Sequence, residues 1–462
     1  MTSQSPKPLS EPLDDTGRQN RLLELAEGLL AAARPAGADA ADVVAVSGRA
    51  LSVSCRLGKV EETDRADSDG LGLRVFVGRR QAVVSSNRCD AAEFAELAER
   101  AVAMARAAPE DPYCGLADPQ RLAKDWAGLD ILDVREVSAD DLAALALASE
   151  EAGRAVSGIT NSDGASASWS LGGIVLATSD GFRGGYSGSS FSVSCALIAG
   201  QGTAMERDYE YETRTHLADL PAADEIGRKA AERTVCRLGA RKLASCQVPV
   251  VYEPRTASSL VGHFLGAVSG AAIARKTSFL KDKLGGKVFK EGVAIIDDPL
   301  RPRGLRSRPF DAEGVAAAPL DLVAGGILQS WLLDAATARE LGLATTGHAR
   351  RGVAGPPAPG PSNCHLAAGA VSPEDLIKSV DRGLYVTELI GFGVNAVTGD
   401  YSRGAAGLWI EKGELAFPVS EVTIAGNLND IYAGLTPADD LSFKRAVNAP
   451  TVLIDRMTLA GR

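Results

Sequence analysis

The stretch from residue 159 to residue 202 constrains the fold more than any other part of the sequence. Side chains alternate there with a period of two, as in Ala-Ser-Ala-Ser-Trp at 165–169 and Phe-Ser-Val-Ser-Cys at 191–195, and Asp180-Gly181 interrupts the pattern. Successive side chains of a β-strand point to opposite faces of the sheet. The stretch therefore predicts a meander of antiparallel strands with one packed face and one wet face of small polar residues.

The rest of the N-terminal half contains helices and strands in groups. Apolar spacing and capping residues predict helices at residues 18–33, 90–107, 138–155 and 222–238, and short β-branched or alternating runs predict strands at 42–47, 51–57, 71–77 and 81–86. Grouped elements favour an α+β domain over a doubly wound one. We therefore expect a disordered tail at residues 1–17 and an N-terminal α+β domain with an antiparallel sheet at residues 18–243.

The C-terminal half, residues 244–462, is rich in strands and glycine. Helices are predicted only at residues 257–273, 333–341 and 373–380, with a strand at 248–252 before the first of them and further strands between and after them. This many strands with few helices predicts a barrel-like or sandwich domain. The expected fold class is thus α+β with two domains.

Charge and composition exclude several classes of function. The 462 residues carry a formal net charge of −10, which opposes binding to nucleic acid, and the basic clusters at 301–308 and Arg350-Arg351 are short. No apolar run approaches the ~20 residues of a membrane span, and the N-terminus lacks the apolar centre of a signal peptide. Seven cysteines without paired spacing fit reduced thiols. We expect a cytoplasmic protein that binds neither nucleic acid nor membrane.

One helical segment and a series of short motifs carry a family resemblance. Ser258-Ser259-Leu260-Val261-Gly262-His263 follows a predicted strand. The motifs, in chain order, include Gly70-Leu71-Gly72-Leu73-Arg74-Val75, Thr178-Ser179-Asp180-Gly181-Phe182, Thr277-Ser278-Phe279-Leu280, Ser307-Arg308-Pro309-Phe310-Asp311, Thr346-Gly347-His348-Ala349 and Gly391-Phe392-Gly393-Val394-Asn395. In this order and spacing, from about residue 51 to the C-terminus, the chain resembles the TldD/PmbA family.

The resemblance implies that this chain lacks the zinc chemistry of its relatives. Zinc-bearing members of the family carry His-Glu-x-x-x-His at this helix, so Ser258 stands in place of the first ligand and Ser259 in place of the general base, while His263 remains. A hydroxyl replaces neither group at neutral pH. The third ligand of those members, a late cysteine, is also missing from the corresponding residues 389–393.

The resemblance further implies a PmbA or TldE type subunit, with no catalytic residue and no metal of its own. Zinc is then expected in a TldD-type partner, with which this chain forms a heterodimer that processes or degrades peptides or unfolded polypeptides. A homodimer is expected at most when that partner is absent. Members of the family have also been described as modulators of DNA gyrase, and the acidic charge of this chain favours protein or peptide contacts over DNA contacts.

Three residues outside the helix are candidate groove or interface contacts, namely His348, Asn395 and Phe392. Two rival hypotheses stay open. The chain could be a peptide-binding or regulatory protein without a peptidase partner, or an independent hydrolase that uses His263 with Asp297, Asp298 or Cys364. Cys364 and His365 are adjacent on a predicted strand, so their side chains face opposite ways and do not share a site.

Overall fold

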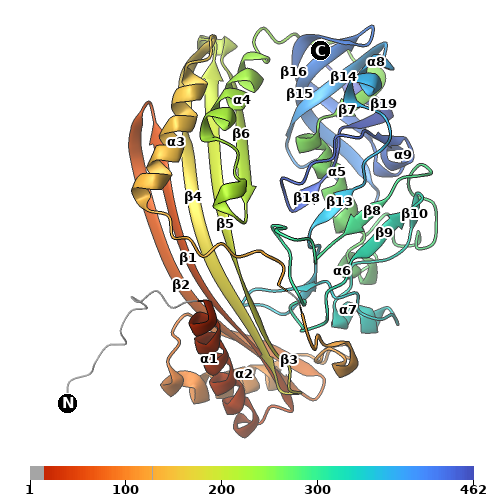
Figure 1. Cartoon of the computed structure of the whole chain (residues 1–462). Helices are drawn as coiled ribbons and strands as arrows, with labels where there is room; N and C mark the ends of the chain where they lie inside the picture. The colour runs from red at the N-terminus through yellow and green to blue at the C-terminus, as the bar shows by residue number, and fades with distance from the viewer. Residues whose placement is uncertain (1–14, 127, 462) are drawn as a thin grey trace.

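A computed structural model of the chain describes residues 15–126 and 128–461 and shows two parts that face each other (Figure 1). The N-terminal part is a six-stranded antiparallel sheet with helices, and the C-terminal part contains a small closed barrel. Both the predicted α+β class and the predicted barrel-like domain are confirmed. The predicted tail falls largely outside the described residues, and helix α1 begins at Asp15, before its predicted start.

The N-terminal sheet has the strand order β3-β2-β1-β4-β5-β6. Its strands are β1 (Ala40–Arg56), β2 (Lys59–Val77), β3 (Arg80–Ser86), β4 (Ile159–Thr178), β5 (Arg183–Ala199) and β6 (Glu206–Arg214), and its helices are α1 (Asp15–Ala36), α2 (Phe94–Ala107), α3 (Ala139–Arg154) and α4 (Ala223–Val235). The two predicted strands at 42–47 and 51–57 form one strand, because β1 pairs with β2 and β4 through the polar residues between them.

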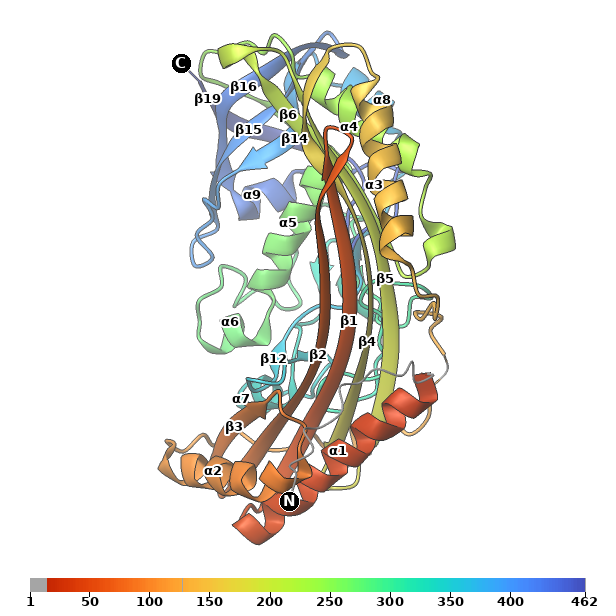
Figure 2. The same ribbon diagram turned by 90° about the vertical axis from the view of Figure 1, so that its left-hand side faces the viewer.

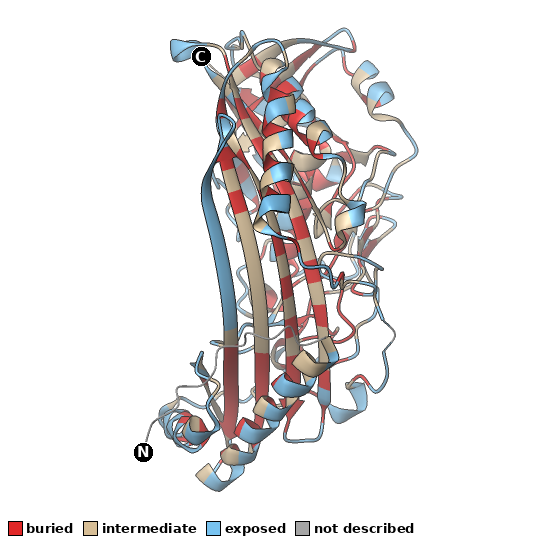
Figure 3. Ribbon diagram, turned by 60° about the vertical axis from the view of Figure 1, so that its left-hand side comes forward, coloured by how far each residue is buried: buried red, intermediate tan, exposed pale blue. Residues whose placement is uncertain are grey.

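The two faces of this sheet have different surroundings. Odd-numbered residues of β4 such as Ala167, Trp169 and Leu171 are buried beneath helices, whereas the even-numbered Ser168 and Ser170 are half-buried on the opposite face. Figure 3 shows this alternation as stripes along the strands. A packed face and a more polar face are therefore both present. The polar face is turned toward the C-terminal part, and at one end its Val44 and Leu176 are buried against Phe310.

Helices cover the packed face in two pairs. Helices α1 and α2 pack on one end of the sheet and α3 and α4 on the other, so each pair has its own core (Figure 2). Helices α3 and α4 meet at Gly153 and Gly227, where a Cβ on Gly227 would lie 1.8 Å from the carbonyl oxygen of Ser149. Glycine is required there because the two backbones touch.

The C-terminal part is built around the ring of strands β16-β15-β14-β7-β19, which the pairing of β16 with β19 closes. Its strands are β7 (Cys246–Tyr252), β8 (Ile295–Asp297), β9 (Leu320–Ala324), β10 (Ile327–Leu328), β11 (Ala349–Arg350), β12 (Ala358–Pro359), β13 (Cys364–Leu366), β14 (Arg382–Ile390), β15 (Asp400–Glu411), β16 (Glu414–Asn427), β17 (Leu435–Pro437), β18 (Val447–Asn448) and β19 (Val452–Ala460). The helices are α5 (Pro254–Ala267), α6 (Gly270–Ala274), α7 (Ala335–Glu340), α8 (Pro373–Lys378) and α9 (Leu428–Ala433).

Helix α5 supplies the apolar centre of this part. Leu260, Val261 and Phe264 share one core with barrel strands and with the second sheet, β10-β9-β8-β13-β18. The predicted helix at 257–273 is divided into α5 and α6, because the chain leaves the helical path at Val268 and Ser269. None of the helices described from residue 15 to residue 461 is long and apolar enough to cross a membrane.

A buried ionic cluster joins the two parts of the molecule. Asp42 on β1 accepts hydrogen bonds from Arg74 Nε at 2.8 Å and from Arg351 Nη1 at 2.5 Å, and Arg74 Nη2 lies 3.6 Å from Glu313 Oε1. Burial opposes the ionisation of Asp42, but Arg351 and Arg74 outweigh it and hold the pKa of Asp42 below its usual value. Removal of one partner from such a cluster leaves an uncompensated buried charge.

The contact between α3 and α4 predicts opposite effects for one substitution at two helical glycines. Gly227→Ala should lower the free energy of unfolding by about 1–3 kcal/mol, because the added methyl group collides with the backbone of α3. Gly262→Ala on α5 meets no atom within 4 Å, so it should leave stability unchanged or raise it by up to about 1 kcal/mol. Urea unfolding measures both, and equal effects would contradict the predicted backbone contact.

Glu313 should make stability depend on pH. Burial, opposed by Arg74 and reinforced by Asp311, raises its pKa to about 7, above its value in the unfolded chain. The folded state therefore binds more protons between these two pKa values, and the free energy of unfolding falls as pH rises through that window. Glu313→Gln should remove about 1–3 kcal/mol of this dependence between pH 5 and pH 8. Urea titrations at both pH values measure the free energy of unfolding, and the exposed Glu99→Gln variant is the control. An equal change in this free energy between the two pH values in the wild type and in Glu313→Gln would refute the prediction.

Candidate functional site

Helix α5 starts at a charged junction between the two parts of the chain. Glu253 follows strand β7 and is the N-cap residue of α5. Pro254 occupies the first turn of the helix, where a backbone N–H has no partner within the helix and its absence costs nothing. Arg255 donates to Asp208 on β6 at 2.9 Å and to Glu253 at 2.9 Å. Arg233 of α4 pairs with Glu253 at 2.8 Å. These ion pairs fix the position of α5 relative to the N-terminal sheet.

Ser258 and Ser259 turn their hydroxyl groups back onto their own helix. Ser258 Oγ donates to the carbonyl oxygen of Arg255 at 2.8 Å, and Ser259 Oγ donates to that of Thr256 at 2.7 Å. Both hydroxyl protons are therefore already used, and neither side chain is held by a base that could activate it. In these positions the helix carries neither a metal ligand nor a general base.

His263 lies half-buried beside the ring of Tyr401, with the two ring centroids 6.0 Å apart. Its Nε2 is covered and lacks a hydrogen-bond partner, as does Nε of the neighbouring Arg403. Burial first, and the charge of Arg403 second, lower the pKa of His263, so the imidazole is neutral at pH 7. Among the described residues, no three His, Cys, Asp or Glu side chains are grouped closely enough to hold a metal ion.

The side of α5 next to His263 is open. A Cβ atom added to Gly262 or Gly266 would meet no atom within 4 Å, and both residues are exposed. These glycines lie one turn apart and continue the line of Ser259 along the helix. The helix therefore presents a strip of small residues that another backbone can approach closely.

The loop that joins β14 and β15 lies beside this strip. Val394 forms a bridge with Tyr401, the same tyrosine that contacts His263. Asn395 holds the loop in shape, because its Oδ1 accepts from the N–H of Val397 at 2.9 Å. Phe392 at the tip is 96% exposed. The structure thus brings Asn395 and Phe392 to the neighbourhood of α5.

His348 lies elsewhere and is fully buried. Its Nε2 is 3.1 Å from Asp297 Oδ1, and its Nδ1 is 2.7 Å from the carbonyl oxygen of Thr346. Asp297 also accepts from the backbone N–H of Ser362 at 2.8 Å. His348 therefore connects its own turn to strand β8 inside the C-terminal part, and it does not line a groove in the isolated chain.

The structure does not join His263 to the other residues of the hydrolase hypothesis, although Asp297 and Cys364 are paired on neighbouring strands. Cys364 is fully buried, and burial followed by the charge of Asp297 raises the pKa of its thiol well above the usual value. His365 lies against Phe443, with the ring centroids 5.0 Å apart. Asp297 is engaged by His348 and Ser362 rather than by His263. No nucleophile and base are paired among these residues.

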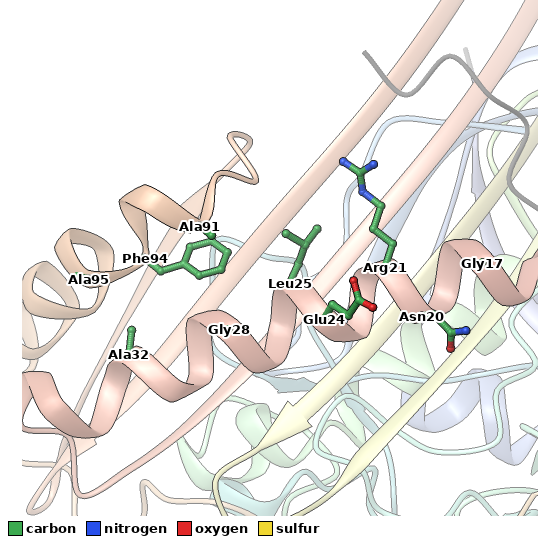
Figure 4. A pocket seen from close by; sticks show the side chains of 10 residues that line it. All are labelled: Gly17, Asn20, Arg21, Glu24, Leu25, Gly28, Ala32, Ala91, Phe94 and Ala95. Carbon is green, nitrogen blue, oxygen red and sulfur yellow. The ribbon is translucent and has the colours of Figure 1, made fainter. Parts of the chain in front are cut away.

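The grooves on the N-terminal part include two with different linings. One, of 410 Å³, crosses the polar face of the sheet, and its lining includes Ser54, Ser166, Ser194, Tyr209 and Tyr211. The other, of 880 Å³, lies between α1 and α2, where Figure 4 shows Leu25, Ala32 and Phe94 along it. The first groove offers hydroxyl groups, and the second is mainly apolar.

Arg403 is the residue at this site that sequence patterns did not predict. It stands on β15, far along the chain from α5, and only barrel closure brings its guanidinium group to His263. A lone arginine within a strand has no distinctive spacing, so nothing in the sequence indicated it.

Three models of the PmbA/TldA metallopeptidase family match consecutive parts of the chain. Domain 1 matches residues 41–105, the central domain residues 132–238 and the C-terminal domain residues 245–461. The chain is 37% identical to the metalloprotease PmbA of Escherichia coli O157:H7 over 446 residues, which cover 96% of this chain and 97% of that protein.

Solved structures share the architecture. A protein from Bacteroides thetaiotaomicron, described as a proposed modulator of DNA gyrase, superimposes with a TM-score of 0.88 at 27% identity and covers 97% of this chain and 100% of that one. TldE from Thermococcus kodakarensis gives a TM-score of 0.84 at 20% identity, with 94% and 99% covered. At that identity the second likeness concerns the fold alone.

Proposed function

Because the chain belongs to the PmbA/TldD metallopeptidase family, we propose that it is the subunit without zinc of a cytosolic heterodimeric peptidase. A TldD-type partner supplies the zinc and the general base. This chain supplies walls and contacts for a peptide or an unfolded polypeptide. The relatives are named metalloproteases, and that name supports a role in proteolysis.

One observation carries the proposal, namely the emptied zinc position on α5. Ser258 and Ser259 bond to their own helix, and His263 is the one imidazole on that face. Structural and catalytic zinc sites need three or four protein ligands, and catalysis needs a base besides. A chain that keeps the whole family fold without these groups is suited to act with a partner that has them.

The surface beside α5 supports assembly. The strip of Gly262 and Gly266 allows close backbone approach, and the adjacent loop exposes Ile390, Phe392 and Val397. Apolar side chains at the centre of a patch are typical of protein interfaces. We propose that this combined surface, α5 and the 390–397 loop, faces the partner.

A peptide-binding protein without a partner is the second candidate. The hydroxyl-lined groove on the sheet favours it, because Ser166 and Ser194 pair at 2.9 Å across strands and leave a polar surface beside two tyrosines. The backbone N–H and C=O groups of an extended peptide can hydrogen-bond to such hydroxyl groups. Copurification with a zinc-bearing subunit separates the two candidates.

Coexpression with a TldD-type subunit tests the proposal. We expect a 1:1 complex with peptidase activity and zinc in the partner, and no stoichiometric zinc in this chain alone. Gly262→Trp should abolish the complex while the chain stays folded, because the residue has open space in the monomer. Mass measurement, zinc analysis and peptide cleavage across the separated peaks record the outcome.

The matched control for this experiment is Glu99→Trp on the exposed side of α2, which should leave assembly intact. Equal loss of the complex in both variants would remove α5 from the interface. Full activity in the partner alone, unchanged by this chain, would favour the peptide-binding candidate instead.

Restoring two of the missing groups should not create an enzyme. The double variant Ser258→His and Ser259→Glu rebuilds the helical motif with His263, but residues 389–393 still lack a third ligand and no neighbouring group orients the new histidine. We expect peptide turnover at the level of the unmodified chain with added zinc. Chelator-sensitive turnover well above that background would show that a third ligand exists.

A further inference from the structure

The fold brings two basic segments together, residues 301–308 and the pair Arg350-Arg351. Arg308 Nη1 donates to the carbonyl oxygen of Ala349 at 3.1 Å, which places it next to Arg350. Asn363 holds the first segment, because its Oδ1 accepts from the N–H of Arg306 at 2.8 Å. Arg306, Arg308 and Arg350 therefore gather at one place on the C-terminal part.

These three arginines have no acidic partner. Within residues 15–126 and 128–461, the ion pairs of the structure include none of them, although the whole chain carries a net charge of −10. Burial first, and then the charges of Arg306 and Arg308, lower the pKa of Arg350, so the three groups repel one another. The charges of Asp311 and Asp297 act on Arg308 and Arg350, but among the described residues neither carboxylate forms an ion pair with the cluster.

The deepest of the three is only partly satisfied. Arg308 is 7% exposed, and both its Nε and its Nη2 lack hydrogen-bond partners. A buried N–H without a partner costs about 1–3 kcal/mol, and more on a charged group. Arg306 and Arg350 are exposed above it. An anion bound by Arg306 and Arg350 would bring negative charge close to the buried guanidinium group of Arg308.

The nearby carboxylates are already occupied. Asp311 accepts from the backbone N–H groups of Glu313 at 2.9 Å, Val315 at 3.0 Å and Ala349 at 3.0 Å. Asp297 is bonded to His348 and Ser362. Their charges partly offset those of Arg308 and Arg350, but neither carboxylate can hydrogen-bond to the arginines without breaking these bonds. The free N–H groups of Arg308 are therefore left for an anion from outside the chain.

Aromatic rings lie beside the cluster, and they indicate that the ligand has an apolar group as well as a negative charge. Phe310 follows Arg308 closely in sequence and contacts Tyr186 of the polar sheet face at 5.4 Å and Trp126 at 4.9 Å between ring centroids. Trp126 is exposed in part. A carboxylate attached to an apolar group matches this arrangement better than a bare inorganic ion.

We propose that Arg306, Arg308 and Arg350 form a binding site for the C-terminal carboxylate of a peptide, with the aromatic rings beside it receiving the last side chain. The choice of a peptide as the ligand rests on the proposed function. Guanidinium groups bind carboxylates with two parallel hydrogen bonds, which gives this site preference for a free chain end over an amide.

The test is fluorescence anisotropy with a fluorescein-labelled flexible peptide that ends in phenylalanine and has a free carboxylate, compared with the same peptide amidated. We expect the full chain to bind the free acid about tenfold or more tightly. The double variant Arg306→Gln and Arg350→Gln should lose this difference. The control, Arg34→Gln with Arg100→Gln on the exposed sides of α1 and α2, removes the same charge and should keep it.

Three results would overturn the site. Equal binding of acid and amide would exclude carboxylate recognition, and this comparison needs no variant. Equal weakening in the control would show a general charge effect. Inorganic phosphate or a labelled oligonucleotide that competes through the same arginines as well as the peptide does would assign the site to phosphate groups. Copurification with the TldD-type subunit is measured separately, so the proposed function and this site can fail independently.

Discussion

The pleat of the long antiparallel sheet is the constraint on which the rest of the structure depends. Because successive side chains point to opposite faces, every strand divides its residues between two environments. The apolar set, with Val53, Trp169 and Phe191, is buried under helices. The other set stays small and polar, and it faces the C-terminal part. A shift of one residue in register would exchange the two sets, so the helices and the polar face are fixed together.

Buried charge, rather than apolar packing alone, holds the two parts in position. Asp42 and Arg74 stand on the sheet, while Glu313 and Arg351 stand on loops of the C-terminal part. Near the other end of the sheet, Arg255 of α5 is bonded to Asp208. Such pairs are sensitive to the loss of one partner, and they therefore specify one relative orientation of the parts. Helix α5, with Ser258, Ser259 and His263, is held in that orientation by the bonds of Arg255.

Within this frame the chain presents three features that its own packing does not use. Packing within the monomer does not cover or pair these features, namely the open strip on α5, the exposed Phe392 and the arginines near Ala349 that form no ion pair. The three differ in kind: the strip is an uncovered stretch of helix backbone, Phe392 is an exposed apolar side chain, and the arginines carry positive charge without an ion pair. We propose that contact with a partner covers the first two and that a bound carboxylate neutralises the third.

The sequence by itself determined the α+β class, the two-faced sheet and most helices, because these depend on local periodicity and on single residue types. The tertiary structure decided what depends on neighbours distant in sequence. The charged residues 59–69 become a strand because β1 is long enough to pair with them, Arg403 reaches His263 because the barrel closes, and His348 is buried because Asp297 accepts from it. The basic segments around Arg308 and Arg350 looked like separate solvated loops in sequence. They form one cluster only because folding places the guanidinium group of Arg308 in hydrogen-bonding contact with the carbonyl oxygen of Ala349.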